Sequence, residues 1–138
     1  MVDRQEVGAI GRGILVLVGV AEGDGESDAA YIAGKIVDLR LFSPAADADT
    51  PEQSLAEIGG EALIVSQFTL LGDARKGRRP SWSAAAQPAV ASGFYERVVE
   101  LVRQRGIRTE TGTFRAHMQV ELVNDGPVTI LIDSRRLF

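Results

Sequence analysis

Three polar side chains in this sequence directly follow an apolar run, at positions where a hydrophobic core would normally have apolar residues. Ser66, Gln67 and Thr69, with Phe68 among them, follow the apolar run 62–65, which commits the segment to the interior. Buried hydroxyl and amide groups must find hydrogen-bond partners or lose about 1–3 kcal/mol each. The segment is either a strand that emerges into water or a row of hydrogen-bonding groups at the mouth of a pocket. Because side chains alternate along a strand, all four line one cavity only if the strand twists or ends there.

Gly126 and Pro127 stand between two apolar segments, in an Asn-Asp-Gly-Pro run that begins at Asn124. The ordinary interpretation of this run is a hairpin turn. The functional interpretation is a cis peptide bond, which about 5–6% of bonds before proline adopt. A cis bond here could aim two successive carbonyl oxygens the same way and form a rigid pair of hydrogen-bond acceptors.

Basic residues gather in the segment 73–79, which carries four of them and one acid. Arginine side chains match the oxygen geometry of phosphate, so this segment could grip a phosphate group. A solvated hairpin loop explains the same residue types equally well. The four candidates are Arg75, Lys76, Arg78 and Arg79.

Composition excludes several kinds of site. The 138 residues include no cysteine and one histidine, His117, which rules out thiolate nucleophiles, disulfides and multi-histidine metal sites within one chain. We therefore expect no metal and no cofactor. The net charge of −4 argues against a generic nucleic-acid coat protein. No apolar run approaches the roughly 18 residues of a membrane span, and the start lacks a signal-peptide pattern. We expect a soluble, cytoplasmic protein with no membrane and no DNA partner.

The elements that must position these residues form a single domain over residues 1–138, as the length and the 45% apolar content indicate. Unbroken apolar residues over 14–18 favour a strand that is buried on both faces. Because two helices are inserted between long strands, the pattern predicts an α+β domain rather than a βαβ repeat. The predicted strands are 6–10, 14–18, 63–70, 118–123 and 128–132.

Two segments have helical periodicity. Ser27 is expected to cap a helix over 28–40, because serine is a favoured residue at that position. Pro88 can open a second helix that runs to about residue 105, and Gly106 is expected to end it.

Three stretches, 8–20, 66–81 and 118–130, together resemble the D-aminoacyl-tRNA deacylase family, also known as the D-tyrosyl-tRNA(Tyr) deacylase family. Their sequences are GAIGRGILVLVGV, SQFTLLGDARKGRRPS and MQVELVNDGPVTI, and a TGTF stretch at 111–114 supports them. The resemblance covers roughly residues 2–134. Each string is short, but their order and the basic loop between them make the match specific.

The resemblance implies a homodimer built around a β-barrel-like, mostly antiparallel sheet with two helices, and an active site at the dimer interface. Its partner would be the 3′ end of an aminoacyl-tRNA. Ser66, Gln67, Phe68 and Thr69 would line the catalytic pocket for the terminal adenosine and the ester. The substrate-binding residues would be Met118, Asn124, Gly126 and Pro127, with a cis Gly126–Pro127 bond reaching into the partner's pocket, and the RNA-binding residues would be the four basic candidates of 73–79.

The implied reaction is hydrolysis of D-aminoacyl-tRNA, and of glycyl-tRNA mischarged on a non-cognate tRNA. An aminoacyl ester is already activated, so positioning and electrostatics suffice without a triad or a metal. Backbone N–H groups near Phe68 and Thr69 could receive the oxyanion, and the substrate's ribose 2′-hydroxyl could help to activate water. Thr69 has no adjacent base and is expected to position rather than attack. Carbonyls of Gly126 and Pro127 would hold the α-amino group and leave no room for an L side chain.

The chain departs from the family pattern at its start. Family chains begin with an extra strand whose Gln-Arg-Val stretch supplies an arginine that helps to hold the Gly–Pro element. That strand is absent before Val2, and we expect the true start to lie upstream of Met1. Trp82 stands where the family usually has a phenylalanine. The alternatives are a catalytically impaired tRNA-end-binding relative that lacks the first strand, and a structural homodimer with no RNA partner.

Overall fold

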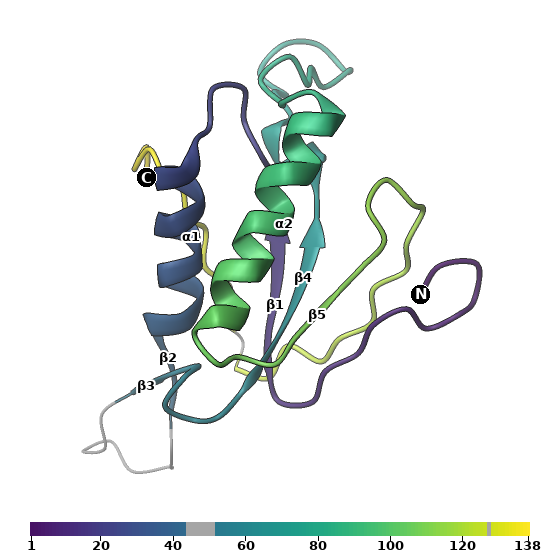
Figure 1. Cartoon of the computed structure of the whole chain (residues 1–138). Helices are drawn as coiled ribbons and strands as arrows, with labels where there is room; N and C mark the ends of the chain where they lie inside the picture. The colour runs from purple at the N-terminus through teal and green to yellow at the C-terminus, as the bar shows by residue number, and fades with distance from the viewer. Residues whose placement is uncertain (44–51, 127) are drawn as a thin grey trace.

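The computed structural model describes residues 1–43, 52–126 and 128–138. They form a small α+β domain in which two helices pack on one face of a three-stranded sheet (Figure 1), with a two-stranded sheet beside them. The elements in chain order are β1 (Gly13–Val18), α1 (Glu26–Asp38), β2 (Arg40–Phe42), β3 (Gln53–Ser54), β4 (Glu61–Ser66), the 3-10 turn η1 (Phe68–Leu71), α2 (Pro88–Gln104) and β5 (Thr109–Thr111).

The three-stranded sheet has the order β1-β4-β5, and both of its strand pairs are parallel. The prediction of a mostly antiparallel sheet is therefore wrong, since only the short β2–β3 pair is antiparallel among the described strands. The reason lies in the connections. Helix α1 follows β1 and helix α2 follows β4, and each helix returns the chain to the end of the sheet where the strand began. The described strands form an open sheet rather than a closed barrel.

Helix α1 begins at Glu26, and its N-cap is Gly25 rather than the predicted Ser27. Asp28 lies three residues after Gly25, and its Oδ2 accepts a hydrogen bond from the Gly25 N–H at 2.9 Å. This bond holds the pKa of Asp28 below its usual value, as expected for a carboxylate at the positive end of a helix. Helix α2 begins at Pro88 as predicted, and Gly106 follows it with a φ of +82°, which confirms the predicted stop.

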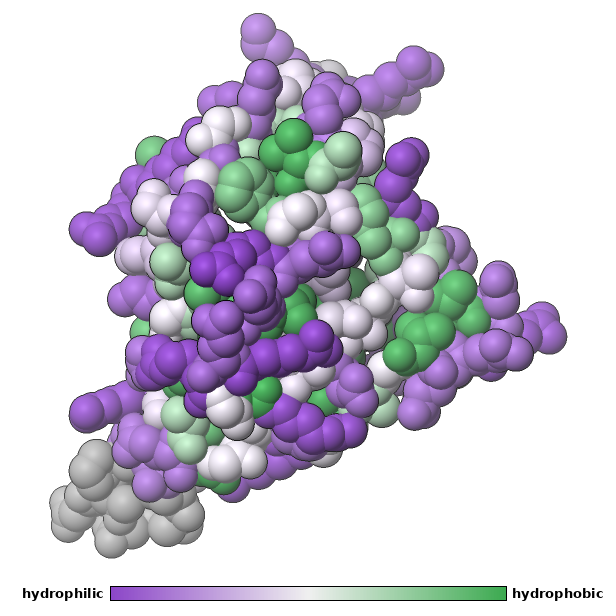
Figure 2. Space-filling model, in the orientation of Figure 1, coloured by the Kyte–Doolittle hydropathy of each residue, from purple (hydrophilic) through white to green (hydrophobic). Residues whose placement is uncertain are grey.

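The core lies between the sheet and the two helices. Its largest fully buried side chains are Leu55, Ile64, Val37 and Val102. Tyr95 of α2 donates its hydroxyl to the Ile64 carbonyl oxygen at 2.7 Å, and burial raises the pKa of this tyrosine. The outward side of the helix layer is mostly hydrophilic (Figure 2), as expected for amphipathic helices. The central strand β4, which leads to the polar turn, is therefore firmly held.

One face of β1 is less covered than the sequence predicts. Ile14 and Val16 pack against the core, whereas Leu17 is 44% exposed. Side chains alternate along a strand, so the exposed residue lies on the face opposite the helices. The predicted burial of 14–18 on both faces is wrong for the described structure.

Of the other predicted strands, one is shorter in the structure and three do not form part of a sheet. The predicted strand 63–70 ends at Ser66, four residues early. Segments 6–10, 118–123 and 128–132 join neither sheet. Near them, Gln119 pairs with Met1 and donates its N–H to the Met1 carbonyl at 2.9 Å. A strand needs a neighbouring backbone to pair with, and the described residues offer these segments no further partner in a sheet. Their apolar side chains stay exposed, with Val123 at 90% and Leu131 at 72%.

No helix in the described part of the chain is long and apolar enough to cross a membrane.

Candidate functional site: a polar turn at the end of the central strand

The chain turns sharply where β4 ends. Ser66 is the last residue of the strand, and Gln67 leads into the 3-10 turn. The Gln67 N–H donates to the Val18 carbonyl at 2.7 Å, which fastens the turn to the end of β1. Gly19 makes the close approach possible, because a Cβ there would lie 2.4 Å from Leu71 Cδ2. The turn is therefore held between the ends of two neighbouring parallel strands.

This turn brings Gln67 and Thr69 together. Gln67 Nε2 donates a hydrogen bond to Thr69 Oγ1 at 2.5 Å. From the sequence, the four side chains were expected to share one site only if the strand twisted or ended here, and β4 does end at Ser66. Ser66 and Gln67 are half-buried, whereas Phe68 and Thr69 are exposed. An amide cannot remove a proton from a hydroxyl at neutral pH, so the Gln67 contact orients Thr69 and does not activate it as a nucleophile.

The basic segment forms a hairpin that directly follows the turn. Asp73 and Ser81 close it with two backbone hydrogen bonds, of 2.7 and 2.9 Å. Arg75 binds back onto Asp73, with Nε–Oδ1 at 2.9 Å and Nη2–Oδ2 at 2.7 Å. This guanidinium lowers the pKa of the Asp73 carboxyl to about 2. Within the described ranges, Lys76, Arg78 and Arg79 are exposed and form no ion pair, so they are the charges most available to an anionic partner.

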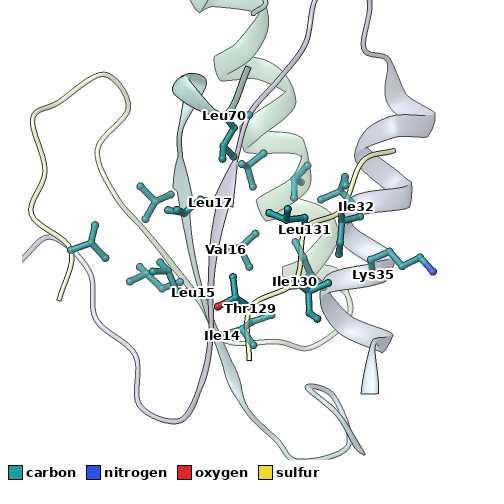
Figure 3. A pocket seen from close by; sticks show the side chains of 18 of the residues that line it. Ile14, Leu15, Val16, Leu17, Ile32, Lys35, Leu70, Thr129, Ile130 and Leu131 are labelled. Atoms are coloured by element: carbon teal, nitrogen blue, oxygen red, sulfur yellow. The ribbon is translucent and has the colours of Figure 1, made fainter. Parts of the chain in front are cut away.

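A large cleft runs along β1 and is lined by side chains from both faces of this strand. Its volume is ≈ 2160 Å³, and it is bordered by β1, by α1 and by the segment that contains Thr129, Ile130 and Leu131 (Figure 3). The cleft is lined by Met118, Asn124 and Gly126, but not by the four residues of 66–69. The cleft thus borders three of the predicted substrate-binding residues, and it reaches Val65 and Leu70 on either side of the 66–69 turn without being lined by the turn itself.

The Asn124 turn is stabilised by its own side chain. Asn124 Oδ1 accepts from the Val128 N–H at 3.3 Å, and Asn124 Nδ2 donates to Thr129 Oγ1 at 3.2 Å. The predicted turn is therefore present on both sides of Gly126. Pro127, and with it the predicted cis bond, lies outside the described residues.

Met118 lies close to β4. Its Sδ accepts from the Thr113 N–H at 3.4 Å, and a Cβ on Gly112 would lie 2.6 Å from this sulfur and 3.5 Å from Val65 Cγ1. Met118 thus approaches the strand residue that precedes Ser66. His117 is exposed, in keeping with an ordinary surface histidine.

Sequence reasoning assigned no role to Asp73. The available signal was its position two residues before Arg75, since an aspartate commonly bonds to the backbone two residues on. The structure shows that bond, with the Arg75 N–H donating to Asp73 Oδ1 at 3.0 Å. No group of three or more metal-ligating side chains occurs among the residues described.

Comparisons with known proteins agree with the resemblance. A family model described as D-Tyr-tRNA(Tyr) deacylase matches residues 1–133. A D-aminoacyl-tRNA deacylase of Anaeromyxobacter dehalogenans (strain 2CP-C) is 59% identical over 137 residues, which are 99% of this chain and 91% of that protein. An inactive D-aminoacyl-tRNA deacylase of Bacillus subtilis (strain 168) is 52% identical over 133 residues, 96% of this chain and 99% of that protein. A solved structure, a c-Myc DNA unwinding element binding protein, matches with a TM-score of 0.83 at 37% identity. The match covers 94% of this chain and 87% of the chain in that structure. The chain belongs to the D-Tyr-tRNA(Tyr) deacylase family.

Proposed function

We propose that this protein hydrolyses the ester bond of D-aminoacyl-tRNA and releases tRNA and the free amino acid. The observation that carries the proposal is the polar turn of 66–69, where a hydrogen-bonded Gln67–Thr69 pair stands at the surface directly before a basic hairpin. Such a turn can position a polar ester while the hairpin holds RNA phosphates. Membership of the family supports the same reaction.

The proposed chemistry uses positioning rather than a strong nucleophile. A water molecule attacks the ester carbonyl carbon, and the negative charge develops on the carbonyl oxygen. The backbone N–H groups of Phe68 and Thr69 donate hydrogen bonds to this oxyanion. Donors that are already in position stabilise the charge that develops in the transition state. The neighbouring ribose 2′-hydroxyl helps to remove the proton from the water. The ribose 3′-oxygen then leaves with a proton, and the carboxylic acid is released.

The proposal extends to a homodimer in which Gly126 and Pro127 of one subunit reach the 66–69 turn of the other. This arrangement would bring Gly126, which lines the cleft, to a turn that does not line it. The Gly126 and Pro127 carbonyls, across a cis bond, would hold the substrate's α-amino group and exclude an L side chain. Glycine has no side chain to exclude, so mischarged glycyl-tRNA would also be hydrolysed. We place the protein in the cytoplasm, where its substrate is made.

The experiment compares hydrolysis of D-tyrosyl-tRNA and L-tyrosyl-tRNA by the wild type and by Pro127→Ala. We expect the wild type to cleave only the D substrate at an appreciable rate and Pro127→Ala to lose part of this discrimination. An unchanged D/L ratio in the variant would refute the chiral role of Pro127. Absence of cleavage of both substrates by the wild type, with tRNA still bound, would instead favour a binding-only relative, as the name of the Bacillus subtilis protein allows.

A further inference from the structure

Two aromatic rings lie exposed between the polar turn and the basic hairpin. Trp82 is 42% exposed and Phe68 is 56% exposed. Their ring centroids are 6.0 Å apart, with an angle of 56° between the ring planes. Large aromatic rings are usually buried, because each carries a large apolar area. Two neighbouring exposed rings therefore mark a surface that is prepared for a flat apolar partner.

The backbone fixes the position of this pair. Phe68 begins the 3-10 turn, and Trp82 directly follows Ser81, which closes the hairpin onto Asp73. The Trp82 carbonyl accepts from the Ala85 N–H at 3.0 Å. Gly72 lies beneath the indole, since a Cβ there would come 3.2 Å from Trp82 Nε1. Contacts on both sides thus hold the tryptophan beside the turn.

The charges around the pair identify the class of partner. Lys76, Arg78 and Arg79 lie in the hairpin that ends at Ser81, directly before Trp82, and all three are exposed. The hairpin is in the loop region beside the amino-terminal end of α2 (Figure 1). Aromatic rings next to a row of cations are the elements with which proteins hold single-stranded nucleic acid, the rings stacking on bases and the cations contacting phosphates.

We propose that Trp82 and Phe68 form a platform on which a base of the tRNA's single-stranded 3′ end stacks. The hairpin cations hold the flanking phosphates, and the stacked base fixes the strand so that its terminal ester reaches Gln67 and Thr69. This inference rests on the proposed function and deepens it, because it assigns a substrate-positioning role to two side chains outside the polar pair.

Trp82 is the chain's one tryptophan, so its fluorescence reports on this surface without a label. Uncharged tRNA is titrated into the wild type, and the same tRNA without its single-stranded 3′ nucleotides serves as the control ligand. We expect the intact tRNA to quench the tryptophan emission and the shortened tRNA to leave it nearly unchanged. Equal emission changes with both ligands, or binding of intact tRNA with no emission change, would overturn the inference.

Variants test the same point by affinity, measured with labelled tRNA. Stacking of one base contributes enough that Trp82→Leu is expected to raise the Kd by about 5- to 150-fold. Trp82→Phe keeps a ring and is expected to retain most of the affinity. Gln104→Ala, an exposed residue at the carboxyl-terminal end of α2, is the control and should not change the Kd. Circular dichroism checks that each variant is folded.

The outcomes separate this inference from the proposed function. If the wild type cleaves D-tyrosyl-tRNA and folded Trp82→Leu binds and cleaves it with unchanged Kd and KM, the platform is refuted and the hydrolase stands. If folded wild type neither binds nor cleaves tRNA, both fail. A rise in KM for Trp82→Leu, largely restored in Trp82→Phe, supports the platform.

Discussion

The ion pair of Asp73 and Arg75 decides which charges of the basic hairpin can serve a ligand. Both nitrogens that Arg75 uses are directed at the Asp73 carboxylate, at 2.9 and 2.7 Å. Exposed ion pairs contribute little to stability, and this one matters instead through its effect on local charge. It leaves Lys76, Arg78 and Arg79 as the free cations of the hairpin in the described structure.

The first prediction concerns the titration of Asp73. Its pKa is lowered to about 2 by Arg75, so Arg75→Ala should return it toward the ordinary value of 3.8. Because the folded-state pKa is the lower one, the pair's contribution is complete above about pH 4 and is lost as the pH falls through about 2. Carboxyl-carbon NMR of Asp73 measures the shift directly. A pKa near 3.8 in the wild type would contradict the pair.

At the residue scale, the sequence indicates which segments carry polar and charged groups, but not which of their side chains contact one another. The polar set of 66–69 and the basic set of 75–79 could be singled out from residue types alone, but residue types left an emerging strand and a solvated hairpin open as ordinary explanations. The Gln67–Thr69 bond could not be predicted, since it depends on a 3-10 turn that simple strand alternation does not include. The pairing of Arg75 with Asp73 was missed for the same reason, because it depends on local turn geometry.

At the scale of elements, the site depends on how tightly the end of β1 packs against η1. Gly19 lies at this contact, with Leu71 Cδ2 2.4 Å, the Gln67 carbonyl oxygen 3.1 Å and Leu70 Cβ 3.2 Å from where a Cβ would stand. The carbonyl oxygen is backbone and cannot move aside without moving the turn. The packing of one glycine thus links the sheet to the position of the Gln67–Thr69 pair.

The second prediction is that Gly19→Ala displaces η1. We expect it to destabilise the fold by about 1–3 kcal/mol, as overpacking does, and to lower deacylation at least tenfold. Gly34→Ala, in α1, is the matched control, because nothing lies within 4 Å of the added Cβ. Urea unfolding and D-tyrosyl-tRNA hydrolysis measure the two effects. Wild-type activity in folded Gly19→Ala would show that the contact does not position the turn.

The helices were predictable as elements, and the strand directions were not. Pro88 marks the start of α2 and Gly106 marks its end, because the backbone preferences of proline and glycine depend on the residue type alone. The start of α1 was misplaced by two residues, because Gly25 and Asp28 share the cap that Ser27 was expected to supply. Strand direction depends on which distant strand offers a free edge, and apolar periodicity contains no information on this.

At the scale of the whole molecule, the sheet has one well-covered face and one poorly covered face. The helices cover the first, and the ≈ 2160 Å³ cleft runs along β1 beside the 129–131 segment. The exposed apolar residues of 118–132, such as Leu122 at 60% and Ile130 at 52%, lie along this side. The sequence predicted strands over 118–123 and 128–132, and pairing would require a neighbour that the described residues do not supply.

In the proposed function, the turn after β4 is where a D-aminoacyl ester is cleaved. The most direct measurement is single-turnover hydrolysis of D-tyrosyl-tRNA by the wild type and by Gln67→Ala. Gln104→Ala is the matched control, because Gln104 bonds only Glu100 on the exposed side of α2 among the described side chains.

We expect the wild type to cleave the D substrate and Gln104→Ala to do so equally fast. Gln67→Ala should be slower by about 10- to 100-fold, since misplacement of a positioned group by about 1 Å costs up to that factor, while it still binds tRNA. Equal rates in Gln67→Ala and the wild type would contradict the assignment of the site, and no cleavage by the wild type would contradict the assignment of the reaction.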